Sequence, residues 1–226
     1  MIFLEEKVHN EAVVMRYVCE HTTILVPFIL HWGTKEESPL GLGPFIIMEY
    51  IEHEMNMCDA LNTPGFDIWD CPILDPNTNE HKLETLFEQL ADILLQLSTL
   101  TMPKTGSLNQ IDNFTWEVTQ RPLTLGMNEL VRLGTLPRSK LPKPGATFET
   151  ASSYFNFLAD VHLDHFLHQR NDSIDDETDY RRKYVARKLF RTLTSESRFT
   201  SQTTDAGTSP LWCDDLRPAN ILIDKD

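Results

Sequence analysis

The sequence predicts an α+β fold in two parts: a small N-terminal part with one helix and two strands, and a larger, mainly helical part. Three observations predict it. An amphipathic helical repeat opens the chain, two short apolar runs follow it, and longer helical repeats occupy much of the remainder. With 226 residues, 41% of them hydrophobic, the chain can bury one sizeable core or two small ones.

The first helix is predicted over residues 5–21. The apolar residues that recur there at helical spacing are Val8, Ala12, Met15 and Val18. Glu11 lies beside this apolar row, whereas Glu5 and Glu6 do not, which makes Glu11 a candidate for an inward-facing carboxylate. The alternative is a rim residue with its stem packed and its head in water.

Two strands are predicted next, at residues 26–32 and 44–51, because both are short apolar runs separated by a turn rich in Gly, Pro and charge. They suggest an antiparallel hairpin. The chain then becomes polar and irregular, as expected of a connection between two lobes. We therefore divide it into an N-terminal lobe, residues 1–53, and a C-terminal lobe, residues 54–226.

The C-terminal lobe is predicted to be largely helical. Helices are expected over residues 83–97, 151–169 and 179–193 from their amphipathic patterns. Residues 102–148 carry many Pro and Gly residues, so we expect a loop-rich insert with one short helix near residues 127–133. An insert of this kind often shapes a substrate site.

The chain carries 34 acidic and 20 basic side chains, a formal net charge of −14. This charge repels polyanions, so we expect neither nucleic-acid binding nor docking on an anionic membrane through a broad basic face. We find no apolar stretch near the ~20 residues that span a bilayer, and the acidic N-terminus does not match a signal peptide. With four sparse cysteines, these features predict a cytoplasmic protein with reduced thiols; the oligomeric state stays open.

The most informative segment is LWCDDLRPANILID, residues 211–224. Asp215 and Asn220 have the D-x-x-x-x-N spacing of a kinase catalytic loop, in which the Asp accepts the proton of the acceptor hydroxyl and the Asn oxygen holds a metal ion. A short loop that ends in the predicted strand 221–223 would fix both groups beside a transferring phosphoryl group. The segment therefore predicts phosphoryl transfer, with residues 213–220 as the catalytic loop.

WCDDLRPANILID resembles the H-G-D-x-x-x-x-N-[IL]-[LIV] signature of the aminoglycoside phosphotransferase and choline kinase-like family, particularly its fungal members, within the protein kinase-like fold. KVHNEAVVMRYV resembles that family's N-lobe helix, with Glu11 at the position of the Glu that pairs with the ATP-anchoring lysine. GPFIIMEYIE resembles the strand that enters the hinge, where the backbone of Glu49, Tyr50 and Ile51 would meet adenine.

The resemblance implies a two-lobe kinase-like fold that uses ATP and Mg²⁺ to phosphorylate a hydroxyl of a small molecule, with Asp215 as base and Asn220 as metal ligand. The acidic balance and the insert are compatible with a cationic acceptor, although they do not identify it.

The sequence departs from the family pattern in the loop and at both ends. Cys213 stands where the signature has His, and Asp214 stands where it has Gly. A lysine strand and phosphate lid are expected before the first helix, and a second metal-binding Asp after residues 221–223; Asp224 comes too early for that role. We therefore expect a chain truncated at both ends, with little turnover or nucleotide stabilisation. The alternative is an inactive kinase-like remnant that serves as a binding or regulatory module.

Overall fold

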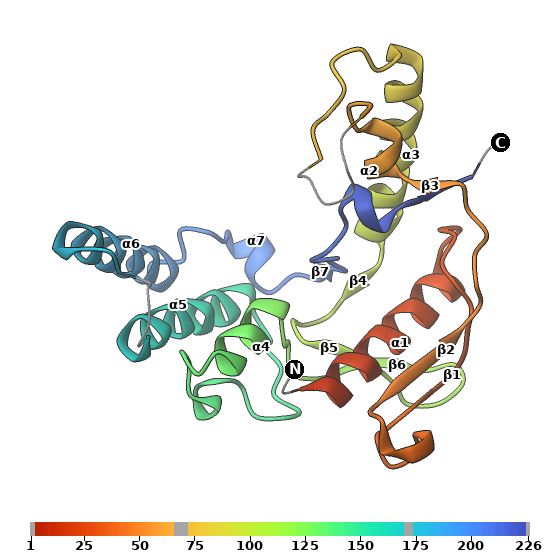
Figure 1. Cartoon of the computed structure of the whole chain (residues 1–226). Helices are drawn as coiled ribbons and strands as arrows, with labels where there is room; N and C mark the ends of the chain where they lie inside the picture. The colour runs from red at the N-terminus through yellow and green to blue at the C-terminus, as the bar shows by residue number, and fades with distance from the viewer. Residues whose placement is uncertain (1–2, 66–71, 170–173, 225–226) are drawn as a thin grey trace.

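A computed structural model of the chain describes residues 3–65, 72–169 and 174–224 (Figure 1). Over these ranges the chain forms seven α-helices and eight short strands, and the strands pair as four two-stranded antiparallel sheets. The predicted mixture of helices and antiparallel strands is confirmed.

The helices are α1 (Leu4–His21), α2 (Met57–Leu61), α3 (Glu80–Thr99), α4 (Leu125–Arg132), α5 (Ala151–His168), α6 (Glu177–Ser195) and α7 (Gln202–Asp205), with 3₁₀ turns η1 (Pro39–Gly41), η2 (Arg138–Lys140) and η3 (Pro218–Asn220). The strands pair as β1 (Ile29–Gly33) with β2 (Phe45–Met48), β3 (Met55–Asn56) with β8 (Leu222–Ile223), β4 (Thr101–Met102) with β7 (Ser209–Pro210), and β5 (Ser107–Gln110) with β6 (Trp116–Gln120).

The predicted helices are confirmed, and side-chain caps mark the N-terminal ends of α3, α4, α5 and α6. Asn79 accepts a hydrogen bond from the Lys82 amide, so α3 begins three residues before its first predicted residue. Thr124 caps α4 in the same way, through the amide of Met127. The predicted β1–β2 hairpin is also confirmed, with shorter strands than the apolar runs suggested.

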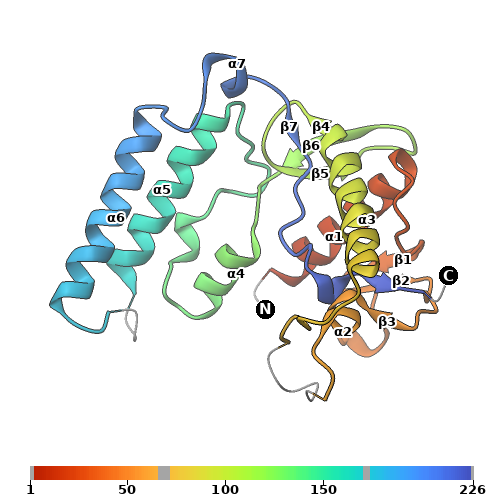
Figure 2. The same cartoon turned by 90° about the horizontal axis from the view of Figure 1, so that it is seen from above.

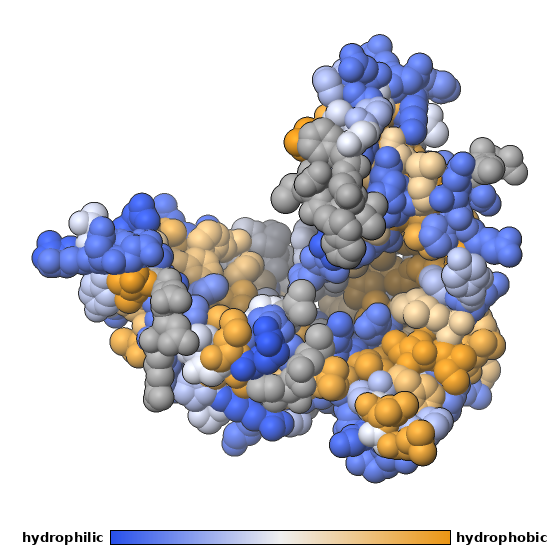
Figure 3. All heavy atoms as spheres, in the orientation of Figure 1, coloured by the Kyte–Doolittle hydropathy of each residue, from blue (hydrophilic) through white to orange (hydrophobic). Residues whose placement is uncertain are grey.

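α1 lies between two β-hairpins (Figure 1). On one side His9 contacts the Trp32 ring of β1, with ring centroids 4.8 Å apart. On the other side Val13 packs in a buried cluster with Leu108 of β5 and Val118 of β6. The outer face of the β1–β2 hairpin stays apolar and exposed (Figure 3). The helix is thus held from two sides rather than from one.

The β5–β6 hairpin corrects the prediction that residues 102–148 are essentially loop with one helix. The many Pro and Gly residues obscured a short alternating pattern, in which Leu108 and Val118 point inward while their neighbours are polar. The turn between the strands is closed by Asp112, whose carboxylate accepts a hydrogen bond from the Phe114 amide.

Of the two alternatives for Glu11, the exposed one holds and the inward-facing one does not, because Glu11 is exposed. Ala12 and Val13 are the buried positions at the middle of α1, so the packed side of the helix is turned toward the two hairpins and Glu11 lies on the opposite side.

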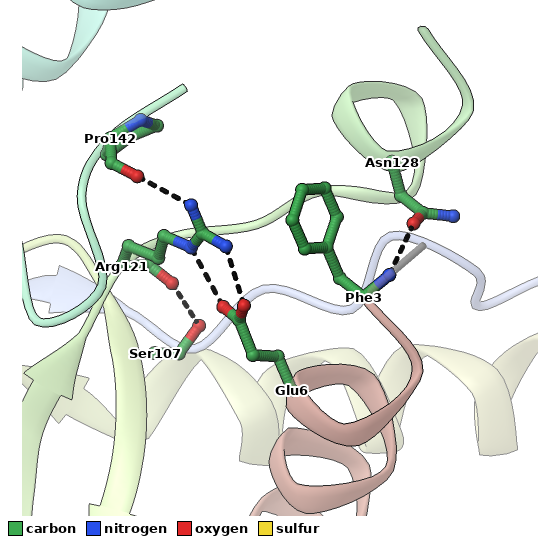
Figure 4. Close-up of polar contacts among 6 residues, drawn as sticks. All are labelled: Phe3, Glu6, Ser107, Arg121, Asn128 and Pro142. Carbon is green, nitrogen blue, oxygen red and sulfur yellow. Dashed lines mark hydrogen bonds and ion pairs between the residues drawn. The ribbon is translucent and has the colours of Figure 1, made fainter. Parts of the chain in front are cut away.

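The first turn of α1 is anchored to the β6–α4 connection (Figure 4). Arg121, only 3% exposed, donates to Glu6 through Nε and Nη2 and to the Pro142 carbonyl through Nη1. Phe3 is buried in a cluster with residues of α4 and α5, and the guanidinium groups of Arg121 and Arg138 each lie 4.8 Å from its ring centroid. These contacts fix α1 against the centre of the molecule.

The remaining helices form two groups on opposite sides of this centre. α5 and α6 lie side by side as an antiparallel pair, whereas α2 and α3 stand with β3 and β8 at the far side (Figures 1 and 2). The β4–β7 pair links these groups. In the described ranges, no helix has both the length and the apolar character needed to cross a membrane.

Candidate active site

The strand β8, which follows the predicted catalytic loop, is held in place by its pairing with β3. In the β3–β8 pair Met55 lies opposite Ile223 and Asn56 opposite Leu222. Main-chain bonds extend this pairing on both sides, since the Met57 amide donates to Ile221 at 2.8 Å and the Glu54 amide donates to Ile223 at 3.0 Å. The segment that follows the predicted hinge therefore touches the strand that follows the predicted catalytic loop, although about 170 residues separate them.

Apolar side-chain contacts also hold β8 in place. Met57 and Leu61 of α2 form a buried cluster with Leu86 of α3, and Ile221 and Ile223 pack against it. The alternation of residues 221–223 accounts for this arrangement, because two Ile side chains point to the cluster while Leu222 is exposed. The strand gives the preceding loop a rigid end.

Asp215 and Asn220 come together in that loop. The Asn220 Nδ2 donates to the main-chain oxygen of Asp215 at 2.8 Å, and the Arg217 amide donates to the same oxygen at 3.0 Å. The Asp215 carboxylate is exposed and forms an ion pair with Arg217, with 3.1 Å between Oδ1 and Nε. The sequence prediction did not single out Arg217; its position two residues after the candidate base was the available signal.

The amide of Asn220 has a defined direction as a result. Because Nδ2 is engaged with the Asp215 carbonyl, Oδ1 is the atom that remains to accept a donor or to bind a cation. Asn220 is exposed, so an ion could reach this oxygen from solvent. A hard oxygen of this kind suits Mg²⁺, which keeps several waters and takes substrate phosphates as further ligands.

Cys213 and Asp214, which replace the His and Gly of the kinase-like signature, are also on the surface. Trp212 is 78% exposed, and Cys213 and Asp214 are exposed beside it. Burial raises the pKa of the Tyr154 hydroxyl in α5, and the negative charge of Asp214 raises it further.

The predicted hinge residues lie between β2 and β3. The Glu49 amide is used within the β1–β2 hairpin, where it donates to Phe28 at 2.9 Å. Tyr50 is exposed, and the Ile51 carbonyl accepts a hydrogen bond from the ring of His53 at 2.9 Å. Of these residues, Glu49 thus already uses its amide and Ile51 its carbonyl within the chain.

A small hollow joins the hinge to the end of β8. Glu52, His53 and Glu54 line it together with Asp224, and its volume is about 270 Å³. Glu54 and Asp224, the two acidic residues beside β8, each interact with another group of the protein. Residues of the predicted hinge and the residue after β8 thus line the same hollow.

Glu11 does not join this group. No hydrogen bond or ion pair between described residues connects it with Asp215 or Asn220, and it lies on the exposed side of α1. Within the described ranges, no group of three or more His, Cys, Asp and Glu side chains is arranged to hold a metal ion.

We find no family model that matches the chain, and no match among curated proteins or solved structures. The family resemblance therefore rests on the residues of the loop and on the order of the elements before it.

Proposed function

We propose that the protein is a phosphotransferase with a protein kinase-like two-lobe fold, similar to the aminoglycoside phosphotransferase and choline kinase-like family. It transfers the γ-phosphoryl group of ATP to a hydroxyl of a small molecule. The observation that carries the proposal is the hydrogen bond from the Asn220 amide to the Asp215 carbonyl, which aims one oxygen outward beside an exposed carboxylate.

In this proposal the acceptor oxygen attacks the γ-phosphorus while the bond to the bridging oxygen of ADP breaks. Asp215 accepts the proton of the acceptor hydroxyl. Arg217 holds the Asp215 carboxylate at 3.1 Å and orients it. Asn220 would supply one oxygen to Mg²⁺, which when bound would neutralise phosphate charge.

In this proposal the other predicted residues contact the nucleotide or orient a group that does. The backbone of Glu49, Tyr50 and Ile51 would meet the adenine at the hinge through groups other than the Glu49 amide and the Ile51 carbonyl, which form hydrogen bonds within the chain. The hollow that Asp224 also lines lies beside this segment. Glu11 would orient the ATP-anchoring lysine. Since Glu11 lies on the exposed side of α1, this lysine would have to lie on that side as well. The proposal also keeps the division into an N-terminal lobe, residues 1–53, and a C-terminal lobe, residues 54–226.

A second candidate is a kinase-like module that binds a partner without catalysis. Two observations favour it: Glu11 has no cationic partner among the described residues, and Cys213 is exposed where the signature has a bracing His. The two candidates share a fold and differ in turnover.

ADP formation separates them. The assay incubates the chain with Mg²⁺ and ATP over a panel of small-molecule hydroxyl compounds that includes amino alcohols and amino sugars. We expect a slow Mg²⁺-dependent rate that Asp215→Asn lowers about 100-fold or more, with an unchanged circular dichroism spectrum. A rate that Asp215→Asn leaves intact would refute the role of Asp215, and an absence of turnover with every acceptor would favour the non-catalytic module.

A further inference from the structure

The charge of α6 is opposite to that of the whole chain. Residues 177–195 contain six basic side chains and two acidic ones, while the chain has a net charge of −14. Internal ion pairs account for part of the basic charge, since Arg181 binds Glu177, Arg182 and Lys183 both bind Asp179, and Arg191 binds Asp160. The helix nevertheless keeps a positive surplus.

The outward face of α6 combines this charge with apolar side chains. α6 packs mainly on α5, and on the side away from α5 Val185 is 62% exposed and Leu189 56% exposed. Arg181 and Lys188 flank them, and Lys188 lies over the ring of Tyr184. This face is a basic amphipathic surface that the described part of the chain leaves uncovered.

The outward face of α3 has the opposite character. Its exposed apolar side chains include Phe87 and Leu95, and Leu95 is 65% exposed. Glu84, Glu88 and Asp92 are exposed along the same helix, one turn apart. With 20 and 19 residues, α3 and α6 are both about 30 Å long, so the acidic and basic faces match in length as well as in charge.

The two faces belong to distant parts of the molecule. α3 and α6 stand well apart in both ribbon views (Figures 1 and 2), so the α6 face of one molecule does not cover its own α3. A second copy of the chain, however, can present its acidic α3 face to the basic α6 face of the first.

We propose that copies of this chain associate head to tail, with the basic face of α6 in one copy packed against the acidic face of α3 in the next. This inference goes beyond the proposed function and does not depend on it. Such a contact uses two different surfaces, so it propagates into short chains of molecules unless its rotation closes a ring. Because one helix packed on one other helix buries less than the ~1,000 Å² of a stable interface, the association is weak, depends on concentration and weakens with salt.

The test measures weight-average mass by sedimentation over roughly 10 to 500 µM protein. We expect the mass to increase by about twofold or more at low salt and to fall toward the monomer in roughly 0.5 M NaCl. Two charge-reversed chains isolate the contact: Arg181→Glu with Lys188→Glu on α6, and Glu84→Lys with Glu88→Lys on α3. Each reversed chain should stay monomeric by itself.

Mixing the two reversed chains should restore the association, because the acidic α6 of one then faces the basic α3 of the other. Lys143→Glu, at an exposed position outside both helices, is the matched control and should associate like the native chain. A native chain that remains monomeric over the whole range, or reversed chains that still associate singly, would overturn the proposal. So would α6-dependent pelleting with phosphatidylserine vesicles without self-association, which would assign the face to a membrane.

Discussion

Arg121 and Glu6 form a two-point ion pair between the end of β6 and the first turn of α1, with 2.8 Å from Nε to Oε2 and 2.6 Å from Nη2 to Oε1. Arg121 is buried, while the Glu6 side chain is 40% exposed. The pair therefore satisfies a guanidinium that would otherwise lie uncompensated inside the molecule.

We predict that Glu6→Gln lowers the free energy of unfolding by about 3 kcal/mol, because the Arg121 charge stays buried without its carboxylate. Chemical denaturation at pH 7 measures the change. The matched control is Glu177→Gln, which breaks the exposed pair with Arg181 and should cost less than about 0.5 kcal/mol. Equal effects of the two variants would contradict the structural role of the buried pair.

Phe3 gives a second prediction at the same place. Its ring is 4% exposed within the cluster of α4 and α5, so Phe3→Ala should lower the free energy of unfolding by about 3 kcal/mol. Phe114 serves as the control, because it is 92% exposed in the β5–β6 turn and its replacement by Ala should be nearly neutral. If Phe3→Ala were as neutral as Phe114→Ala, the docking of the N-terminus would be wrong.

Asp179 at the start of α6 predicts a pH dependence. A hydrogen bond from Lys183, then those from the Asp175 amide and Arg182, lower the pKa of this carboxyl from 3.8 to about 2. A folded pKa below the unfolded one means that the stabilisation is complete above about pH 4 and is lost as pH falls toward 2. The difference in unfolding free energy between the native chain and Asp179→Asn should therefore shrink from pH 5 to pH 2. A difference that stays constant would exclude this carboxylate as its source.

Much of the architecture could be predicted from sequence periodicity. α1, α3, α5 and α6 are long enough for an amphipathic repeat to identify them, and their caps moved the predicted ends by only a few residues. The β5–β6 hairpin was missed because its strands contribute just two buried aliphatic positions, Leu108 and Val118. Short strands carry too little alternation to stand out in a segment rich in Pro and Gly.

The candidate site was predicted unevenly for a related reason. Asp215 and Asn220 lie five residues apart, so local spacing was enough to assign both to one loop. Their roles as base and metal ligand stay a prediction. The orientation of Glu11 depends on which elements pack against α1, and a sequence pattern does not contain that information until the hairpin is known. Arg121 was missed because its partners, Glu6 and the Pro142 carbonyl, are distant along the chain and show no local motif.

The proposed metal-binding role of Asn220 can be tested most directly with Mn²⁺–ATP, in which paramagnetic Mn²⁺ replaces Mg²⁺ and broadens amide resonances near its site even when binding is weak. We predict selective broadening of the amides of residues 215–221, loss of that broadening in Asn220→Ala, and its retention in the control Asn113→Ala, whose side chain lies in the exposed β5–β6 turn. Broadening that avoids this loop, or that persists unchanged in Asn220→Ala, would contradict the assignment of residues 213–220 as a catalytic loop.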